Sequence, residues 1–138
     1  MKNNLDQLNC ASFEVRDYEC DLQGIVNNAV YQNYLEHARH QFIKSRGLDF
    51  SEITKQGIQL VLIKAELEYK RSLQSGDHFY VQTRIERTSK LKLTFYQKVY
   101  RTRDEQLMLN AIMTVTSTTK EGRPIVFEQA DLLLDNRA

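Results

Sequence analysis

The sequence predicts an α+β domain in which an antiparallel sheet of about five strands wraps around one long central helix. Apolar residues recur at helical spacing in one segment only, residues 29–46. Several later segments alternate apolar and polar residues, as strands with one buried face do. The connections between them have three or four residues, which favours antiparallel hairpins because parallel strands need long crossovers.

The helix is expected from Ala29 to about Arg46. Its apolar side carries Tyr31, Tyr34, Leu35, Ala38, Phe42 and Ile43. Charged residues fall mostly off that side: Glu36, Arg39, His40 and Lys44. Asn27 or Asn28 can cap the start of the helix, and Gly47 can end it in a left-handed conformation.

Strands account for most of the remaining chain. Ser12–Tyr18 is a candidate first strand ahead of the helix. Four strands are expected after it, over Ile58–Ser72, His78–Thr88, Leu91–Arg101 and Gln106–Thr119. The tail Glu128–Asn136 is expected to be a short helix or a docked coil. A sheet with one apolar face must cover it, and the single helix is the available cover.

Length and composition narrow the class of protein. A chain of 138 residues is expected to form one domain, 1–138, with an ordinary hydrophobic fraction of 41%. A net charge of +1 argues against a nucleic-acid partner, and no apolar run approaches a membrane span. Residues 1–9 lack the apolar core of a signal peptide, and Cys10 and Cys20 are too few for a disulfide scaffold. A cytoplasmic location is therefore expected.

The densest chemistry lies where the first strand leads through a glycine-containing loop into the helix. Backbone N–H groups in a first helical turn lack intrahelical partners and can hold an anion, including the oxyanion of an attacked carbonyl. Asp21 lies in the loop, three residues before Gly24, and Asn28 lies at the helix start. This combination suits acyl transfer, although similar Asp-x-x-Gly loops are often simple turns.

The run Asp21–Tyr31, followed by Tyr34, Glu36, Ala38 and Arg39, closely resembles the signature of 4-hydroxybenzoyl-CoA thioesterase-like proteins. This group includes Tol–Pal-associated acyl-CoA thioesterases and relatives of plant acyl-ACP thioesterases. The resemblance is strong over Arg16–Arg39 and continues more weakly to about Val126. It implies the hotdog fold, a helix wrapped by an antiparallel sheet, which agrees with the pattern of elements.

The resemblance also implies the catalytic residues. The family's catalytic carboxylate falls on Asp21, which either attacks the thioester carbonyl or activates a water. The backbone N–H that polarises the carbonyl falls near Asn28, and Gly24 belongs to the same motif. Several close relatives carry His where this chain has Asn28, so any role of that imidazole is absent or altered here.

Other candidate site residues can have either a functional role or an ordinary structural one. Tyr31 can line the acyl pocket or belong to the core. Arg87, Lys90 and Lys92 lie near a hairpin where relatives bind CoA phosphates, but they can equally be solvated charges. Glu36 is a second candidate acid, but its place in the Tyr-x-x-Tyr-x-Glu run favours a structural or supporting role.

The remaining reactive side chains suggest no further chemistry. Cys20 reads as a small buried residue rather than a nucleophile. The three histidines, His37, His40 and His78, lack a zinc-like ligand set, so neither metal nor cofactor is expected.

Hydrolysis of an acyl-CoA is thus the leading function, with acyl-ACP hydrolysis as a related one. A non-catalytic acyl-CoA-binding or scaffolding protein is an alternative, although the presence of Asp21 argues against it. A hotdog dehydratase would typically need a His, and none lies between Cys10 and Glu36. Because relatives pair their sheets across a twofold axis, a homodimer or homotetramer is expected.

Overall fold

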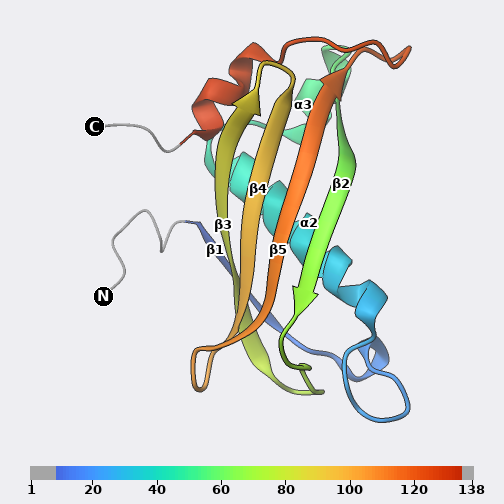
Figure 1. Ribbon diagram of the computed structural model, residues 1–138, viewed down its shortest axis with the longest axis vertical. Coiled ribbons are helices and arrows are strands. Elements are labelled where there is room, and N and C mark those ends of the chain that lie inside the picture. The colour runs from blue at the N-terminus through green and yellow to red at the C-terminus, as the bar shows by residue number, and fades with distance from the viewer. Residues whose placement is uncertain (1–8, 135–138) are drawn as a thin grey trace.

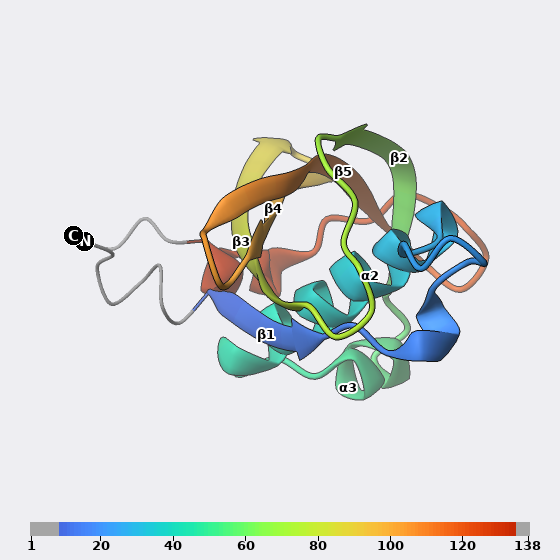
Figure 2. The same ribbon diagram turned by 90° about the horizontal axis from the view of Figure 1, so that it is seen from below.

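A curled sheet encloses one long helix at the centre of the molecule. The computed structural model describes residues 9–134. Helix α2, Asn28–Ser45, crosses behind the sheet in Figure 1, and the strands arch over it in Figure 2. The sheet has five antiparallel strands in the order β1-β3-β4-β5-β2. Their bounds are Cys10–Glu14 for β1, Gln59–Tyr69 for β2, His78–Ser89 for β3, Lys92–Arg101 for β4 and Gln106–Thr118 for β5.

Helix α2 forms where its apolar stripe can be buried. All six apolar residues expected on that stripe are buried against the sheet. The Asn27 side chain caps the helix by accepting the N–H of Ala29 at 3.0 Å. Gly47 follows the helix with φ +86°, so the expected left-handed end is confirmed.

The expected position of Arg39 off the buried side is wrong. Arg39 is only 9% exposed, and its Nη1 donates to Oε1 of buried Gln97 on β4 at 3.1 Å. Gln97 Nε2 in turn donates to the Leu35 carbonyl at 3.0 Å and to Thr83 Oγ1 at 3.2 Å. The hydrogen-bond partner that allows the Arg39 guanidinium to be buried therefore comes from strand β4. The spacing of residues along the helix does not reveal such a partner.

Strand β3 buries alternate residues, as expected: Phe79, Val81, Thr83 and Ile85. Strand β4 instead buries Leu93, Thr94 and Phe95 in succession, and β2 shows no alternation. The alternation breaks on β5, where Met108 and Leu109 are both buried. The register of β4 and β5 shifts between Val99 and Tyr100 at this level, so a bulge admits the extra residue.

The first strand is shorter than expected. It ends at Glu14, and Asp17–Glu19 form a single 3₁₀ turn, η1. The Glu19 carboxylate accepts the N–H of Arg16 at 2.9 Å and the hydroxyl of Tyr34 at 2.8 Å. These two contacts explain why the chain leaves the sheet here.

A second helix, α3 at Phe50–Lys55, was not anticipated. Asp49 caps it by accepting the N–H of Ser51 at 2.8 Å. Its six residues are too few to show a helical period in the sequence. Ile53 is buried and Phe50 packs against the core, so α3 covers the end of α2.

The chain after β5 closes the same end of the molecule with a 3₁₀ helix, η2, at Glu128–Leu133. Phe127, Ala130 and Leu133 are buried there, and the expectation of a short helix is confirmed over Glu128–Leu133. Residues 135 and 136 of the expected segment lie outside the described residues.

Strand β2 forms one edge of the sheet and is exposed along most of its length. Its exposed apolar residues are Val61, Leu62, Ile63 and Tyr69. Such an edge presents unpaired backbone groups beside apolar side chains, which is the pattern of a strand that pairs with another chain.

Candidate active site

The loop before α2 is a tight, internally bonded turn. The N–H of Asp21 donates to the Ile25 carbonyl at 2.9 Å, and the N–H of Gly24 donates to the Asp21 carbonyl at 3.0 Å. Gly24 has φ +81°, a conformation that residues with a Cβ rarely adopt. Gly24 therefore allows the turn that presents Asp21.

The Asp21 carboxylate is exposed and only half engaged by its own loop. Its Oδ1 accepts the N–H of Gln23 at 2.8 Å and that of Ile25 at 3.4 Å. Its Oδ2 has no hydrogen-bond partner among residues 9–134. One oxygen is thus held in place while the other remains available to a substrate or a water.

The start of α2 leaves one N–H available beside this loop. The N–H of Ala29 is taken by the Asn27 side chain and that of Val30 by the Asn27 carbonyl at 2.9 Å. The N–H of Asn28 donates to no acceptor in the described part of the chain. Because it lies at the positive end of the helix dipole, it suits a developing oxyanion.

Tyr31 supports the loop that carries Asp21. It is 2% exposed, and its hydroxyl accepts the N–H of Leu73 at 2.9 Å. The carbonyl of Leu73 accepts the N–H of Val26 at 2.9 Å. Leu73 therefore connects the loop, through Val26, to helix α2, through Tyr31. Burial raises the pKa of Tyr31 and keeps it a neutral phenol. This placement gives Tyr31 a supporting role, and its contact with substrate stays a prediction.

Tyr69 is a neighbour of the site that sequence reasoning missed. It ends β2, is 45% exposed, and its hydroxyl lies 3.4 Å from the Asn28 carbonyl oxygen. Its ring packs edge-on against Tyr31 with centroids 5.5 Å apart. The sequence offers no signal for this contact, because it joins residues 41 positions apart.

Cys20, beside Asp21, does not have the surroundings of a nucleophile. Burial raises the pKa of its thiol, and the charges of Asp17 and Asp21 raise it further. A reactive cysteine needs the opposite shift, so these surroundings argue against Cys20 as the nucleophile.

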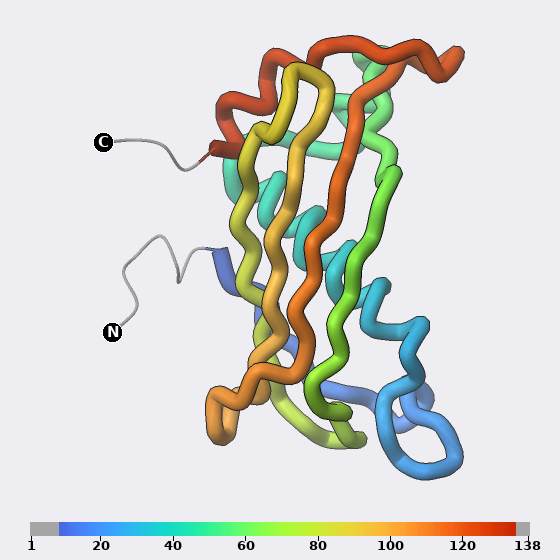
Figure 3. The backbone as a smooth tube through the Cα atoms, viewed as in Figure 1, coloured from blue at the N-terminus to red at the C-terminus, as the bar shows by residue number. Residues whose placement is uncertain are grey.

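The predicted CoA-binding residues lie at the other end of the sheet. Val61 pairs with Thr116, and Thr116 with Lys92, whereas Tyr69 at the far end of β2 contacts Asn28. The eight residue-to-residue steps from Val61 to Tyr69 span about 26 Å. Figure 3 shows the β3–β4 hairpin and the loop before α2 at opposite ends of the molecule. One chain therefore does not bring these two groups together.

The three basic residues also differ in what they contact. Lys90 and Lys92 are exposed. Arg87 instead donates to the carbonyls of Lys90 and Phe127, both at 3.2 Å, and pairs with Asp131 at 3.6 Å. Arg87 thus fastens η2 to the β3–β4 hairpin, and its expected contact with a phosphate remains untested.

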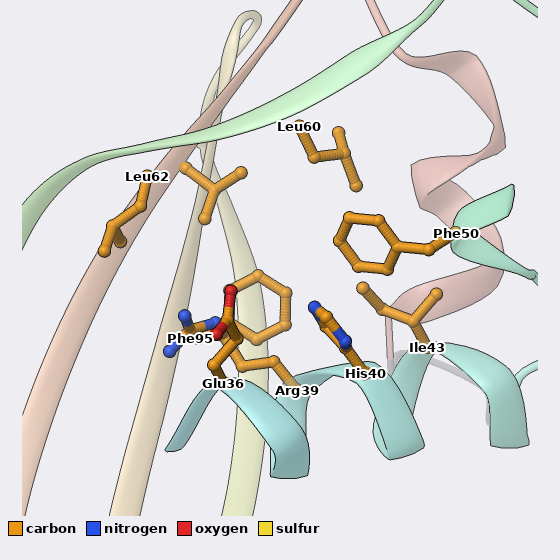
Figure 4. A pocket seen from close by; sticks show the side chains of 9 residues that line it. Glu36, Arg39, His40, Ile43, Phe50, Leu60, Leu62 and Phe95 are labelled. Carbon is orange, nitrogen blue, oxygen red and sulfur yellow. The ribbon is translucent and has the colours of Figure 1, made fainter. Parts of the chain in front are cut away.

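A small cleft of about 100 Å³ lies between α2, α3 and β2. Figure 4 shows its lining, which is Glu36, Arg39, His40, Ile43, Phe50, Leu60, Leu62, Phe95 and Val115. The second candidate acid, Glu36, is therefore in this cleft and not in the loop that carries Asp21.

Residues 9–134 contain neither a candidate metal site nor a helix that could span a membrane. Their acidic, cysteine and histidine side chains form no cluster able to bind a metal ion. Among the same residues, no helix combines the length and apolar character needed to cross a bilayer.

Comparison with known proteins places this geometry in a family. Residues 15–130 match the family model of the Thioesterase-like superfamily. The chain belongs to this superfamily. The resemblance found in the motif of residues 21–39 is confirmed.

Two relatives illustrate what the chain is similar to. An acyl-acyl carrier protein thioesterase of Arabidopsis thaliana, ATL3, is 35% identical over 112 residues, covering 81% of this chain and 59% of that protein. YneP of Bacillus subtilis, whose proposed activity is acyl-CoA thioesterase, is 31% identical over 118 residues, covering 85% of each chain. The chain spans about six-tenths of the length of the curated plant relatives.

A solved structure shares the fold. The 1,4-dihydroxy-2-naphthoyl-CoA thioesterase of Synechocystis superposes with a TM-score of 0.85, covering 94% of this chain and 98% of that one. At 16% identity this similarity concerns the fold alone. The predicted hotdog architecture is confirmed.

Proposed function

We propose that this protein hydrolyses the thioester of an acyl-CoA to the free acid and CoA. The observation that supports it best is that one Asp21 oxygen and the N–H of Asn28, at the two ends of one short loop, both lack a hydrogen-bond partner among the described residues. A carboxylate and an oxyanion donor are the main requirements for acyl transfer from a good leaving group.

Two routes use the same groups. In one, an Asp21 oxygen attacks the carbonyl, the CoA thiolate leaves, and water hydrolyses the resulting anhydride. In the other, Asp21 takes a proton from a water as that water attacks, and the proton then passes to the departing thiolate. In both, the Asn28 N–H stabilises the carbonyl oxygen as it gains negative charge.

We further propose that the working site lies between two chains. Antiparallel pairing of two β2 edges about a twofold axis near Ala65 would bring the Tyr69 end of one strand beside the Val61 end of the other. The basic hairpin of one chain would then lie on the same side as the Asp21 loop of its partner. The exposed apolar residues of β2 support this arrangement. The length of about 26 Å along β2 that separates the two groups within one chain supports it as well.

The pairing predicts a homodimer or a tetramer built from dimers. Light scattering of the purified protein is expected to give at least twice the chain mass of 16.2 kDa. Ile63→Lys adds a charge to the exposed edge and is expected to shift the protein toward monomer, whereas Leu132→Lys on η2 is not. A wild-type mass equal to that of one chain would contradict the dimer.

The activity itself is tested with a panel of acyl-CoAs and acyl carrier protein thioesters. A thiol reagent detects the thiol of released CoA or the freed phosphopantetheine thiol on the carrier protein. Release from the CoA series is the expected result. Faster release from the carrier protein thioesters would instead favour acyl carrier protein thioesterase activity, which is the activity in the name of the plant relative. Binding of acyl-CoA without release of thiol from any substrate would point to a non-catalytic binding protein. A cytoplasmic location and the absence of nucleic-acid partners stay predictions of the sequence.

A further inference from the structure

We infer that the outer face of the sheet binds a second copy of the dimer, so that two sheets pack against each other in a closed tetramer. The outer face is the side of β2, β3, β4 and β5 that is turned away from α2. This inference adds a second interface to the proposed β2 pairing, and it rests on that part of the proposed function for the position of its symmetry axis.

The outer face has no cover among residues 9–134. Helices α2 and α3 both lie on the concave side of the sheet, and Figure 2 shows the strands arching over them with no other described element beyond. Ile112 of β5 and Tyr96 of β4 are paired neighbours on this face, and both are half-buried. The guanidinium of Arg84 on β3 lies 4.3 Å from the centroid of the Tyr96 ring, so the two side chains share the face.

Two ion pairs lie on the outer strands of this face. On β3, Arg84 and Glu86 are 3.2 Å apart, and on β2, Lys64 and Glu66 are 3.0 Å apart. The members of each pair are two positions apart on one strand, so they point to the same side of the sheet. At least 48% of each of these four side chains is exposed, and all four are therefore available to another chain.

One row of paired residues runs between the members of both ion pairs. From β2 to β3 it consists of Ala65, Met113, Phe95 and Ile85. The next row on one side carries Glu66 and Arg84, and the next row on the other side carries Lys64 and Glu86. On each strand the two opposite charges are thus placed symmetrically about the same row.

A twofold axis along this row makes the outer face complementary to itself. Rotation about the axis lays each strand over the same strand of the facing copy, in the opposite direction. Arg84 then lies over Glu86 of the facing copy, and Lys64 lies over Glu66 of the facing copy. Opposite charges meet at every one of these contacts, which favours this pairing over others.

The position of this axis also allows the assembly to close. It passes through Ala65, which is where the proposed β2 pairing has its own twofold axis. Perpendicular twofold axes that intersect generate a closed tetramer, whereas axes that miss each other generate an open filament. The β2 pairing also sets Lys64 of one chain beside Glu66 of its partner, so charges of opposite sign alternate from chain to chain around the centre.

The outer face is large enough for a specific contact. Four strands about 4.8 Å apart, with five residues along each at about 3.3 Å, cover roughly 320 Å² per chain. The four faces of a tetramer together bury roughly 1,300 Å², which exceeds the approximately 1,000 Å² expected of a specific interface. Twisted sheets pack at about 30° to each other, so the closest contacts are in the rows beside the axis, where the ion pairs lie.

The test is a charge swap on β3, followed by sedimentation equilibrium of the full-length protein over a wide range of concentrations. The wild type is expected to have four times the chain mass of 16.2 kDa. Arg84→Glu alone, or Glu86→Arg alone, sets like charges against each other and should leave dimers of twice the chain mass. The double variant Arg84→Glu/Glu86→Arg restores opposite charges across this axis and should restore the tetramer.

Lys55→Glu is the matched control. Lys55 forms an exposed ion pair with Glu52 at 3.6 Å on α3, away from the outer face. Its reversal should leave the tetramer intact. Melting temperatures show whether a single reversal unfolds the chain, and Ile112→Lys on the same face should also give dimers if Arg84→Glu does not fold.

The outcomes separate this inference from the proposed function. A wild-type mass below that of four chains at every concentration would overturn the inference, whether or not the protein hydrolyses acyl-CoA. A double variant that folds but stays dimeric would overturn it as well, because opposite charges would then face each other without effect. A tetramer that is lost in the single variants and regained in the double variant supports it, even if no thioester is hydrolysed.

Discussion

Asp21→Asn is expected to lower kcat for thioester hydrolysis by about 10³-fold or more while the protein stays folded. The amide can neither attack the carbonyl nor accept a proton from water, so both proposed routes lose their reacting group. The Asn side-chain oxygen can still accept the N–H groups of Gln23 and Ile25 that hold the loop. Steady-state kinetics and thermal melting of the two proteins provide the measurement.

Asp17→Asn serves as the control for this substitution. Asp17 is a second exposed acid, four residues before Asp21, and its carboxylate accepts a hydrogen bond from the Ser75 hydroxyl. This variant should retain most of the activity. A folded Asp21→Asn protein that keeps more than about a tenth of wild-type kcat would remove Asp21 from the chemistry.

Gln97→Leu should lower the free energy of unfolding by about 3 kcal/mol, because it leaves a buried guanidinium without its acceptor. Gln97 is fully buried and joins Arg39, Leu35 and Thr83 in one network. Leu has nearly the same size, so the loss comes from unpaired polar groups and not from a cavity. For a chain of this length the melting temperature should fall by about 10 °C, as measured by calorimetry.

Gln82→Leu makes the same chemical change on the outer face of the neighbouring strand. Gln82 is half-buried and has no hydrogen bond from its side chain to another described residue. Its replacement should change the melting temperature little. Equal melting temperatures for the two variants would show that the buried network contributes nothing.

Local patterns predicted most of the fold. The helix was placed within one residue at each end, since Asn27 and Gly47 mark its limits through local backbone chemistry. The expected first strand failed at Asp17–Glu19, where a contact between Glu19 and Tyr34 across fifteen residues bends the chain. Helix α3 is not predicted from the sequence, because a six-residue helix has fewer than two turns and shows no clear helical period.

The candidate site was predicted only in its contiguous part. Asp21, Gly24 and Asn28 come from one stretch of chain, so the sequence shows them together. Tyr69 joins them through strand pairing, and the cleft that contains Phe50 is built from two helices and several strands. Those contacts depend on tertiary packing, which spacing within a motif does not encode.

The order of the strands affects how the chain folds. Strands β3, β4 and β5 follow one another through short hairpins, whereas the edge strands β1 and β2 pair with partners far along the sequence, as Cys10 with Gln82 and Gln59 with Thr118. Closing such long loops is slow, so the three central strands should form first and both edges join later. During that interval the central sheet has bare edges, and refolding should give its best yield in dilute solution.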